Sequence, residues 1–540
     1  MKIRSVEVLE QELKQFLSNP ETTNNLNNAV SKAKEILEIK KDSSFANYAL
    51  ALNDVVNEKS KKSGADFSKS IENFENIIKI DPNFLEAYLM LVKIYRKIDR
   101  EKEYNTLIKA NKQFPDHYLI MFELANLMCF KTGEKEQGLE LFAKCVQKLP
   151  VVDAAWAGLG SAYLINREFE MALKSFETCL AINPENLTSV LGLGVYNYEH
   201  GNFEKAEEYY KQALKINKDS FWGNFNLGLL TLLKGDYENG LEIYEKRDKD
   251  TYLNAYGGRA VPEMNKSHLI ENSNQKIVVL REQGFGDDVM YSRYLKPLKD
   301  FGYQVSYACP PELKEFFKLF PDLDDIEVTN RIPNGVFRYR TFLLSLPWLT
   351  WNIVKGKITK PLKIDLNRLD EKKLEIPNKL KKLTKSKKLK IGLAWSGRPT
   401  HIRDKNRNIP IEMLKDIFKF DADFFVIQKF YKGNDKEYLK QFKNVHDCSD
   451  HLKDFLHTTY YLKNLDIIFT VDTSLVHMSG TVGKETYLFL PMVPDFRWGL
   501  KKDQDWYPSV KLLRQNALND WSQPINECKK IIEKKLSSSS

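Results

Sequence analysis

The sequence predicts an α-helical repeat array followed by two α/β domains, each built on a parallel sheet. Residues of similar size and polarity recur about every 34 positions through the N-terminal half. After residue 275, short apolar strands alternate with amphipathic helices in two successive stretches. The chain also has 540 residues, too many for one hydrophobic core, so three or more domains are expected.

The repeat is clearest in the middle of the N-terminal half. Small residues such as Gly160 allow two helices to approach closely, large ones such as Phe176 fill the groove between them, and Pro184 ends the second helix. We count about five units between Phe45 and Tyr244, preceded by a helical cap. The best unit consists of Trp156, Leu159, Gly160, Tyr163, Ala172, Phe176, Cys179 and Pro184.

This spacing resembles the tetratricopeptide repeat family. The resemblance implies helix pairs that stack into a superhelix, because one pair cannot bury its apolar face alone. Most aromatic side chains of the repeat are therefore expected in the core. The concave face of such an array usually binds an extended peptide or protein, so we expect this half to recruit a protein partner.

The C-terminal half reads as two α/β units. The first has strands at 276–281, 303–309 and 337–346, with a helix at 288–301. A Lys-rich stretch at 379–390 is expected to be a solvated linker. The second unit has strands at 389–395, 424–428, 466–471 and 486–490, and helices at 411–418, 452–462 and 475–482.

The first candidate loop follows the strand at 276–281. Gly284 and Gly286 allow a ligand to approach the backbone, and Asp287 follows them at the expected start of a helix. Ligands of open α/β sheets bind beyond the carboxyl ends of strands, where this loop lies. Asp287 is thus either a helix-capping residue or a carboxylate that takes the proton of an acceptor hydroxyl.

Two loops of the second unit are candidates for binding phosphate. Asp472, Thr473 and Ser474 precede a helix whose N-terminal N–H groups favour an anion, and His477 lies one turn further on. Simple capping with a buried histidine is the alternative. The loop at 396–407 carries a density of basic residues that suits a diphosphate, although an exposed charged loop is also consistent. Its basic residues are Arg398, His401, Arg403, Lys405 and Arg407.

Several enzyme classes are disfavoured by missing motifs. The sequence has no Walker A lysine motif, no complete GxGxxG after a strand and no HExxH. These absences argue against phosphoryl transfer, a dehydrogenase and a zinc protease.

Six segments together resemble glycosyltransferase family 9, a heptosyltransferase-like family of GT-B fold. These are 282–287, 392–397, 407–410, 471–477, 494–498 and 506–508. With the repeats, the layout is similar to O-GlcNAc transferases and bacterial flagellin glycosyltransferases. The resemblance implies a repeat array at 1–250, a connector at 251–275, an acceptor-side Rossmann-like domain at 276–385 and a nucleotide-sugar-side Rossmann-like domain at 386–540.

The resemblance also implies an activity and a set of site residues. The activity is inverting, metal-independent transfer of a sugar from a nucleotide-sugar donor to a protein or glycan acceptor, without a cofactor. Asp287 is then the catalytic base. Ser474 and Glu485 stand where heptosyltransferases usually have glycine and proline, which weakens the case for an ADP-heptose donor. The donor and substrate contacts are expected from Gly284, Gly286, Ser396, His401, Arg407, Gln428, Lys429, Asp472, Thr473, Ser474, His477, Arg497 and Trp498.

The alternative function is a scaffold. In that case the array binds a partner, and the α/β half is a degenerate nucleotide-binding module without catalysis. The intact Asp287, Asp472 and His477 favour the enzyme.

Composition excludes other classes. The net charge of +9 is small beside 82 basic and 73 acidic residues, and the Lys-rich stretch lacks interleaved aromatics, so a nucleic-acid binder is not expected. No apolar run is long enough for a transmembrane helix, and the N-terminus lacks the apolar core of a secretory signal. The six scattered cysteines predict neither a zinc site nor disulfides, and a cytoplasmic location is expected.

Overall fold

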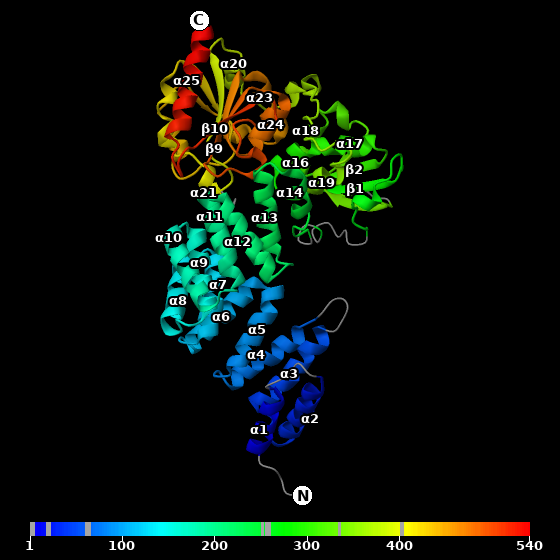
Figure 1. The fold of residues 1–540 in the computed structure, drawn as a ribbon, viewed down its shortest axis with the longest axis vertical. Coiled ribbons are helices and arrows are strands. Elements are labelled where there is room, and N and C mark those ends of the chain that lie inside the picture. The colour runs from blue at the N-terminus through cyan, green and yellow to red at the C-terminus, as the bar shows by residue number, and fades with distance from the viewer. Residues whose placement is uncertain are drawn as a thin grey trace. The chain divides into compact units, whose positions relative to one another are not determined.

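The computed structural model describes residues 6–17, 23–59, 66–249, 253, 261–332, 336–399 and 404–539. Figure 1 follows the chain from its helical N-terminal part to two parallel sheets. The chain forms two compact units, Met1–Tyr196 and Asn197–Ser540, and each is described by itself. Among the described residues, no helix combines the length and the apolar composition that crossing a bilayer requires.

The first unit is built of helices that pair with their neighbours in the chain. Two helices precede the repeats, as the predicted cap requires. Helix pairs then run from α3 onward, and the pair α3 and α4 adds one unit before those with clear spacing. The helices are α1 Val6–Leu17, α2 Thr23–Ile39, α3 Ser44–Lys59, α4 Ser68–Ile80, α5 Leu85–Ile98, α6 Arg100–Gln113, α7 Tyr118–Leu127, α8 Lys135–Lys148, α9 Asp153–Asn166 and α10 Phe169–Ile182, followed by α11 Leu187–Glu199, which begins in this unit and ends in the second.

Glycines let these helices approach one another as the spacing predicts. Phe176 of α10 is fully buried, and a Cβ atom on Gly160 of α9 would lie 2.6 Å from its ring. A Cβ atom on Gly192 of α11 would lie 2.3 Å from the same ring. Real Cβ atoms do not pack that closely, so one large ring fills the groove only because both positions lack a side chain.

The second unit begins with the last helices of the helical region and continues into two α/β lobes. Its helical part comprises α12 Phe203–Ile216, α13 Phe221–Leu233 and α14 Tyr237–Tyr244. The α/β helices are α16 Phe285–Tyr291, α17 Leu295–Asp300, α18 Pro311–Phe317, α19 Leu346–Thr350, α20 Asn378–Leu383, α21 Asp404–Arg407, α22 Asp435–Leu439, α23 Phe455–Asn464, α24 Ser474–Val482 and α25 Ser522–Ser539.

Both sheets are parallel throughout, as alternating strands and helices predict. The four-stranded sheet has the order β3-β2-β1-β4, and the six-stranded sheet has the order β10-β9-β8-β5-β6-β7. Their strands are β1 Lys276–Leu280, β2 Gln304–Ala308, β3 Glu327–Thr329, β4 Tyr339–Phe342, β5 Leu389–Ala394, β6 Ala422–Val426, β7 Val445–Asp447, β8 Ile467–Val471, β9 Thr486–Leu490 and β10 Val510–Arg514.

The strand orders determine where a ligand can bind. In each sheet the order reverses once, between β1 and β4 in the first sheet and between β5 and β8 in the second. A crevice opens at the carboxyl ends of the strands that flank such a reversal. The loops after β1, β5 and β8 are the three candidate loops predicted from the sequence, so the topology brings them to the expected edges.

Several predicted boundaries were wrong. The helix expected at 288–301 starts earlier, at Phe285, and is interrupted by a 3₁₀ turn at Ser292–Tyr294. Pro297 lies just beyond that turn and cannot donate the hydrogen bond that would continue α16. The helix expected at 411–418 is two 3₁₀ turns, Ile411–Leu414 and Ile417–Lys419. The apolar spacing of three residues there fits the tighter 3₁₀ period.

The predicted linker at 379–390 does lie between β4 of the first sheet and β5 of the second along the chain, but part of it is helical. It contains most of α20 and the start of β5. The short strands β3, β7 and β10 were missed, since three-residue or partly exposed strands carry little apolar pattern. The strand predicted at 486–490 is confirmed as β9.

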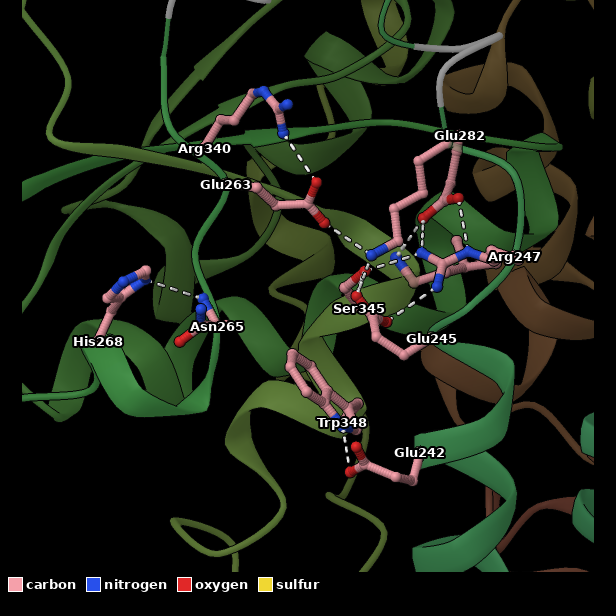
Figure 2. A network of polar contacts seen from close by, with 12 residues as sticks. Glu242, Glu245, Arg247, Glu263, Asn265, His268, Glu282, Arg340, Ser345 and Trp348 are labelled. Atoms are coloured by element: carbon pink, nitrogen blue, oxygen red, sulfur yellow. Dashed lines mark hydrogen bonds and ion pairs between the residues drawn. The ribbon is translucent and has the colours of Figure 1, made fainter. Parts of the chain in front are cut away.

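A buried ion pair ties the segment after α14 to the first sheet (Figure 2). Arg247 donates from Nε and Nη2 to the Glu282 carboxylate, over 2.9 and 2.5 Å, and from Nη2 to Ser345 Oγ over 2.9 Å. Glu282 lies two residues beyond the end of β1, and its carboxylate also accepts the Leu344 N–H. The loop that carries Asp287 therefore starts from a fixed position.

Candidate functional site

Loops from both sheets line one cavity of about 650 Å³. This volume lies within the range of small-molecule sites. Of the residues predicted from the sequence, it is lined by Gly284, Gly286, Asp287, Ser396, Arg407, Gln428, Lys429, Asp472, Thr473, Ser474, His477 and Arg497.

Trp498 does not line the cavity. His401 lies outside the described residues, as does Arg403 of the same loop. Trp498 is buried, and its ring stacks on His477 with centroids 5.5 Å apart and an interplanar angle of 21°. Trp498 therefore supports a wall residue and does not form part of the wall.

Asp287 is held at the first turn of α16. Gly284 is the residue at the N-cap, and its N–H donates to Asp287 Oδ2 over 3.1 Å. Asp287 thus lies at the third helical position and forms one half of a capping box. The structure therefore shows that Asp287 caps the helix. The side chain nevertheless lines the cavity, which leaves a chemical role open to it.

An arginine from the other lobe reaches Asp287. Arg497 Nη2 forms an ion pair with Asp287 Oδ1, and Arg497 Nη1 donates to Asp495 Oδ1 over 2.7 Å. Burial raises the pKa of Asp287, while Arg497 acts in the opposite direction and lowers it. The carboxylates of Asp287 and Asp495 hold the pKa of Arg497 well above its usual range, so the guanidinium stays charged.

The two helix starts meet beside this ion pair. A Cβ atom on Gly286 would lie 2.8 Å from His477 Cδ2 and 3.5 Å from the Cα atom of Ser474. Only glycine lets α16 approach α24 this closely. Gly286 of the first loop therefore allows the two lobes to come into contact beside the cavity.

Thr473 is the N-cap of α24. Its Oγ1 accepts the Leu475 N–H over 3.3 Å, and Arg407 Nη1 donates to the Asp472 carbonyl over 2.5 Å. Arg407 thus joins the loop after β5 to the loop after β8. Burial, then the nearby Asp495 carboxylate, raises the pKa of Asp472.

His477 is a neutral, buried imidazole. Its Nδ1 lies 3.2 Å from Tyr507 Oη, and its Nε2 lies 4.0 Å from Asp472 Oδ1. Burial, together with the charges of Arg497 and Arg293, lowers the pKa of His477 to about 3. His477 can therefore donate or accept a hydrogen bond at neutral pH without carrying charge.

Gln428 and Lys429 follow β6 at the basic side of the cavity. Gln428 Oε1 accepts the Trp395 and Ser396 N–H groups over 3.0 and 3.3 Å, which fixes the end of β5. Lys429 Nζ donates to the Leu452 carbonyl over 3.1 Å. A Cβ atom on Gly397 would lie 2.3 Å from Arg407 Nη2, so this glycine leaves space for the guanidinium.

Sequence reasoning missed several wall residues. Asp495 was noticed only as part of the tail segment, although it caps the turn at Phe496–Trp498 and pairs with Arg497. Phe430 is 43% exposed and lies under the Arg398 guanidinium at 5.7 Å. For Asp495, the only indication in the sequence was its position two residues before Arg497. Nothing in the sequence indicated Phe430. No group of three or more His, Cys, Asp or Glu side chains that could hold a metal ion occurs in the described part of the chain.

Comparison with known proteins concerns the helical region. The tetratricopeptide repeat family matches residues 158–224 and 191–250. The N-terminal region therefore contains tetratricopeptide repeats. Arrays of this kind present surfaces to other proteins, which indicates a protein-interaction role for this region. No curated protein matches the chain.

The solved structures similar to the chain include two that are described as TPR proteins. The pilus biogenesis factor PilW is 17% identical, covers 40% of this chain and 94% of its own, and has a TM-score of 0.33. YrrB, described as a TPR protein with an unusual peptide-binding site, is 16% identical over 35% of this chain and 95% of its own, with a TM-score of 0.29. A thermophilic TPR protein of Thermus thermophilus is 24% identical over 32% of this chain and 95% of its own, with a TM-score of 0.29.

The neutral state of His477 gives a testable pH dependence. Its pKa is lower in the folded protein, about 3, than in the unfolded chain, about 6.5, so the unfolded state binds more protons between these values. The contribution of His477 to the free energy of unfolding is fully present above about pH 6.5 and is lost as the pH falls. We expect the stability advantage of the wild type over His477→Gln to shrink by up to about 1.4 kcal/mol per pH unit in that window. Chemical unfolding at pH 7.5, 6 and 5 measures this, and a constant difference would contradict it.

Proposed function

We propose that this chain is a glycosyltransferase that moves a sugar from a nucleotide sugar to a protein acceptor recruited by the tetratricopeptide region. The two lobes then act as the two Rossmann-like domains of a GT-B enzyme, with 276–385 on the acceptor side and 386–540 on the donor side. The observation that carries the proposal is the shared cavity. Asp287 of the first lobe lines it together with Arg407, Lys429 and the start of α24 from the second.

The proposed reaction uses Asp287 as a general base. The acceptor hydroxyl passes its proton to the Asp287 carboxylate while its oxygen forms a bond to the anomeric carbon. The bond from that carbon to the diphosphate oxygen breaks, and the electron pair leaves with the nucleoside diphosphate. One displacement inverts the anomeric configuration, so no second carboxylate nucleophile is required.

Cationic and N–H groups can stabilise the leaving diphosphate. Arg407 and Lys429 line the cavity, and α24 directs its N-terminus to the same cavity through Thr473 and Ser474. Such groups are strong phosphate partners because charge-assisted hydrogen bonds are short and strong. This donor set supports transfer without a metal ion.

A second candidate function is a non-catalytic nucleotide-binding scaffold. It is favoured by one observation, since Asp287 already interacts with Arg497 through Oδ1 and with the Gly284 N–H through Oδ2. A carboxylate with both oxygens engaged could be purely structural. Hydrolysis of a bound nucleotide sugar, or its transfer, distinguishes the enzyme from the scaffold.

Donor binding should depend on Arg407. We expect one compound in a panel of nucleotide sugars to stabilise the protein thermally, by about 2.7 kcal/mol at 100 times its dissociation constant. Arg407→Ala should weaken that binding by about 1.5–3 kcal/mol, measured by calorimetry. Arg368→Ala is the control, because Arg368 pairs with Asp324 away from the cavity. If Arg407→Ala and Arg368→Ala bind the nucleotide sugar with equal affinity, the diphosphate does not bind at Arg407.

The tetratricopeptide region should select the acceptor. Removing residues 1–184 keeps α11 whole and retains all of the compact second unit. We expect the shortened chain to bind nucleotide sugar normally but to label acceptor protein at about one-tenth of the full rate or less, since each 1.4 kcal/mol of lost partner binding costs tenfold. Transfer of radiolabelled sugar in a cell extract measures this. Full labelling by a correctly folded truncated chain would contradict it.

A further inference from the structure

Arg497 is shared between carboxylates at the wall of the cavity. Its guanidinium pairs with Asp287 on one side and with Asp495 on the other. The side chain is about nine-tenths buried, yet it lines the cavity. Its Nε is buried without a hydrogen-bond partner among the described residues. The group is therefore charged, accessible from the cavity and incompletely satisfied.

Flat aromatic faces surround the guanidinium on its other sides. It lies 4.5 Å from the centroid of Phe496 and 5.7 Å from that of Tyr291. Cation–π contacts of this kind hold a guanidinium without fixing its direction as strictly as a bidentate ion pair does. Arg497 can consequently rotate towards a new anion while it keeps these contacts.

The cavity has no excess of positive charge to offer a diphosphate. Five acidic and five basic side chains line it, and two of the acidic ones are paired with Arg497. A nucleoside diphosphate brings two or more negative charges to this site. Guanidinium and phosphate match in geometry, so an entering diphosphate competes directly with Asp287 for Arg497.

We propose that Arg497 is an exchangeable counter-ion that pairs with Asp287 in the free protein and turns to the donor diphosphate when it binds. This inference rests on the proposed function. Its consequence is an order of events: before the donor binds, the ion pair keeps Asp287 a weak base, and the donor itself frees the carboxylate oxygen Oδ1 for the acceptor proton. Arg497 is then a positioning residue that couples donor binding to activation of the base.

The proposal makes an unusual prediction for binding. Asp287→Asn should strengthen the binding of a nucleoside diphosphate by about tenfold, because Arg497 no longer has to leave a charged partner. Asparagine at this position can still accept the Gly284 N–H, so α16 should keep its start. Calorimetric titration with UDP, GDP, ADP and CDP measures the effect without any need for catalysis.

Asp454→Asn is the matched control. Asp454 lines the same cavity, but it caps α23 and interacts with His457, and it does not pair with Arg497. Removing its charge measures how much the affinity for a nucleoside diphosphate rises when any one negative charge leaves the cavity. We expect this rise to be about threefold or less. In an Arg497→Met background, the Asp287→Asn gain should fall to this control level. Asp495→Asn provides a second variant, with the same expected direction as Asp287→Asn.

The outcomes separate the inference from the proposed function. Equal gains for Asp287→Asn and Asp454→Asn, or weaker binding in Asp287→Asn, would overturn the exchange. A gain that persists undiminished in the Arg497→Met background would also overturn it. If none of the four diphosphates binds to the wild type, the proposed function itself fails and the exchange fails with it.

Discussion

Asp287→Asn should lower turnover by about 10²–10⁴-fold, the usual contribution of a general base. The attacking hydroxyl must lose a proton as it bonds to the anomeric carbon, and Asp287 is the candidate carboxylate at the end of β1 that lines the cavity. Asparagine keeps the size and the capping ability of the side chain but cannot take a proton. Single-turnover sugar transfer, with donor and acceptor both saturating, measures the chemical step.

Asp288→Asn is the control for this measurement. Asp288 is the adjacent residue, is fully buried and bonds to Tyr307 Oη over 2.6 Å and to Arg281 over 3.0 Å. Burial raises the pKa of Asp288 to about 6, and asparagine keeps the size of the side chain and an acceptor oxygen for the Tyr307 O–H. We expect less than about a tenfold loss of turnover. Near-normal turnover in Asp287→Asn, with the protein folded, would show that Asp287 is a structural cap.

Much of the site's backbone could be predicted because the signals are local. A strand followed by two glycines and an aspartate predicts a loop at a sheet edge, and three capping residues predict the start of a helix. Parallel strands bring such loops to the same edge, which is why the loops after β5 and β8 meet at the strand reversal. These inferences need no knowledge of how the two lobes lie.

Contacts between distant residues could not be predicted in the same way. Asp287 and Arg497 are separated by 210 positions, and nothing in either segment indicates the other. The sequence predicted that Arg497 contacts the sugar donor, but it did not predict the two carboxylates that pair with Arg497. The stacking of Trp498 on His477 was equally invisible, because an aromatic in a loop carries no periodic signal.

Buried polar residues at element ends were missed for a related reason. Glu282 begins the first candidate loop, yet its side chain is inaccessible and pairs with Arg247. Sequence patterns assign charged residues to the surface by default, because charge is rarely buried unless it is paired. Only the partner's position reveals the exception.

Arg247→Met should destabilise the second unit by about 3–5 kcal/mol, since it leaves the Glu282 carboxylate buried without its cation. Figure 2 shows Arg247 bonded to Glu282 and Ser345, with Glu245 beside them. The side chains of Arg247 and Glu282 are 3% and 0% exposed, so water cannot replace the lost partner. Hydrogen exchange of the β1 amides, which lie between β2 and β4, should accelerate by about 10²-fold or more.

The pair of variants Arg247→Met and Arg247→Met/Glu282→Gln tests the cause. A neutral glutamine keeps an acceptor for the Leu344 N–H but removes the unpaired charge, so the double variant should recover about half of the loss. Lys296→Met is the surface control, because Lys296 and Asp300 form an exposed pair that should contribute less than about 1 kcal/mol. If the double variant is no more stable than Arg247→Met, the lost stability comes from packing around the arginine stem. The ion pair between Arg247 and Glu282 is then not what fixes the start of the Asp287 loop.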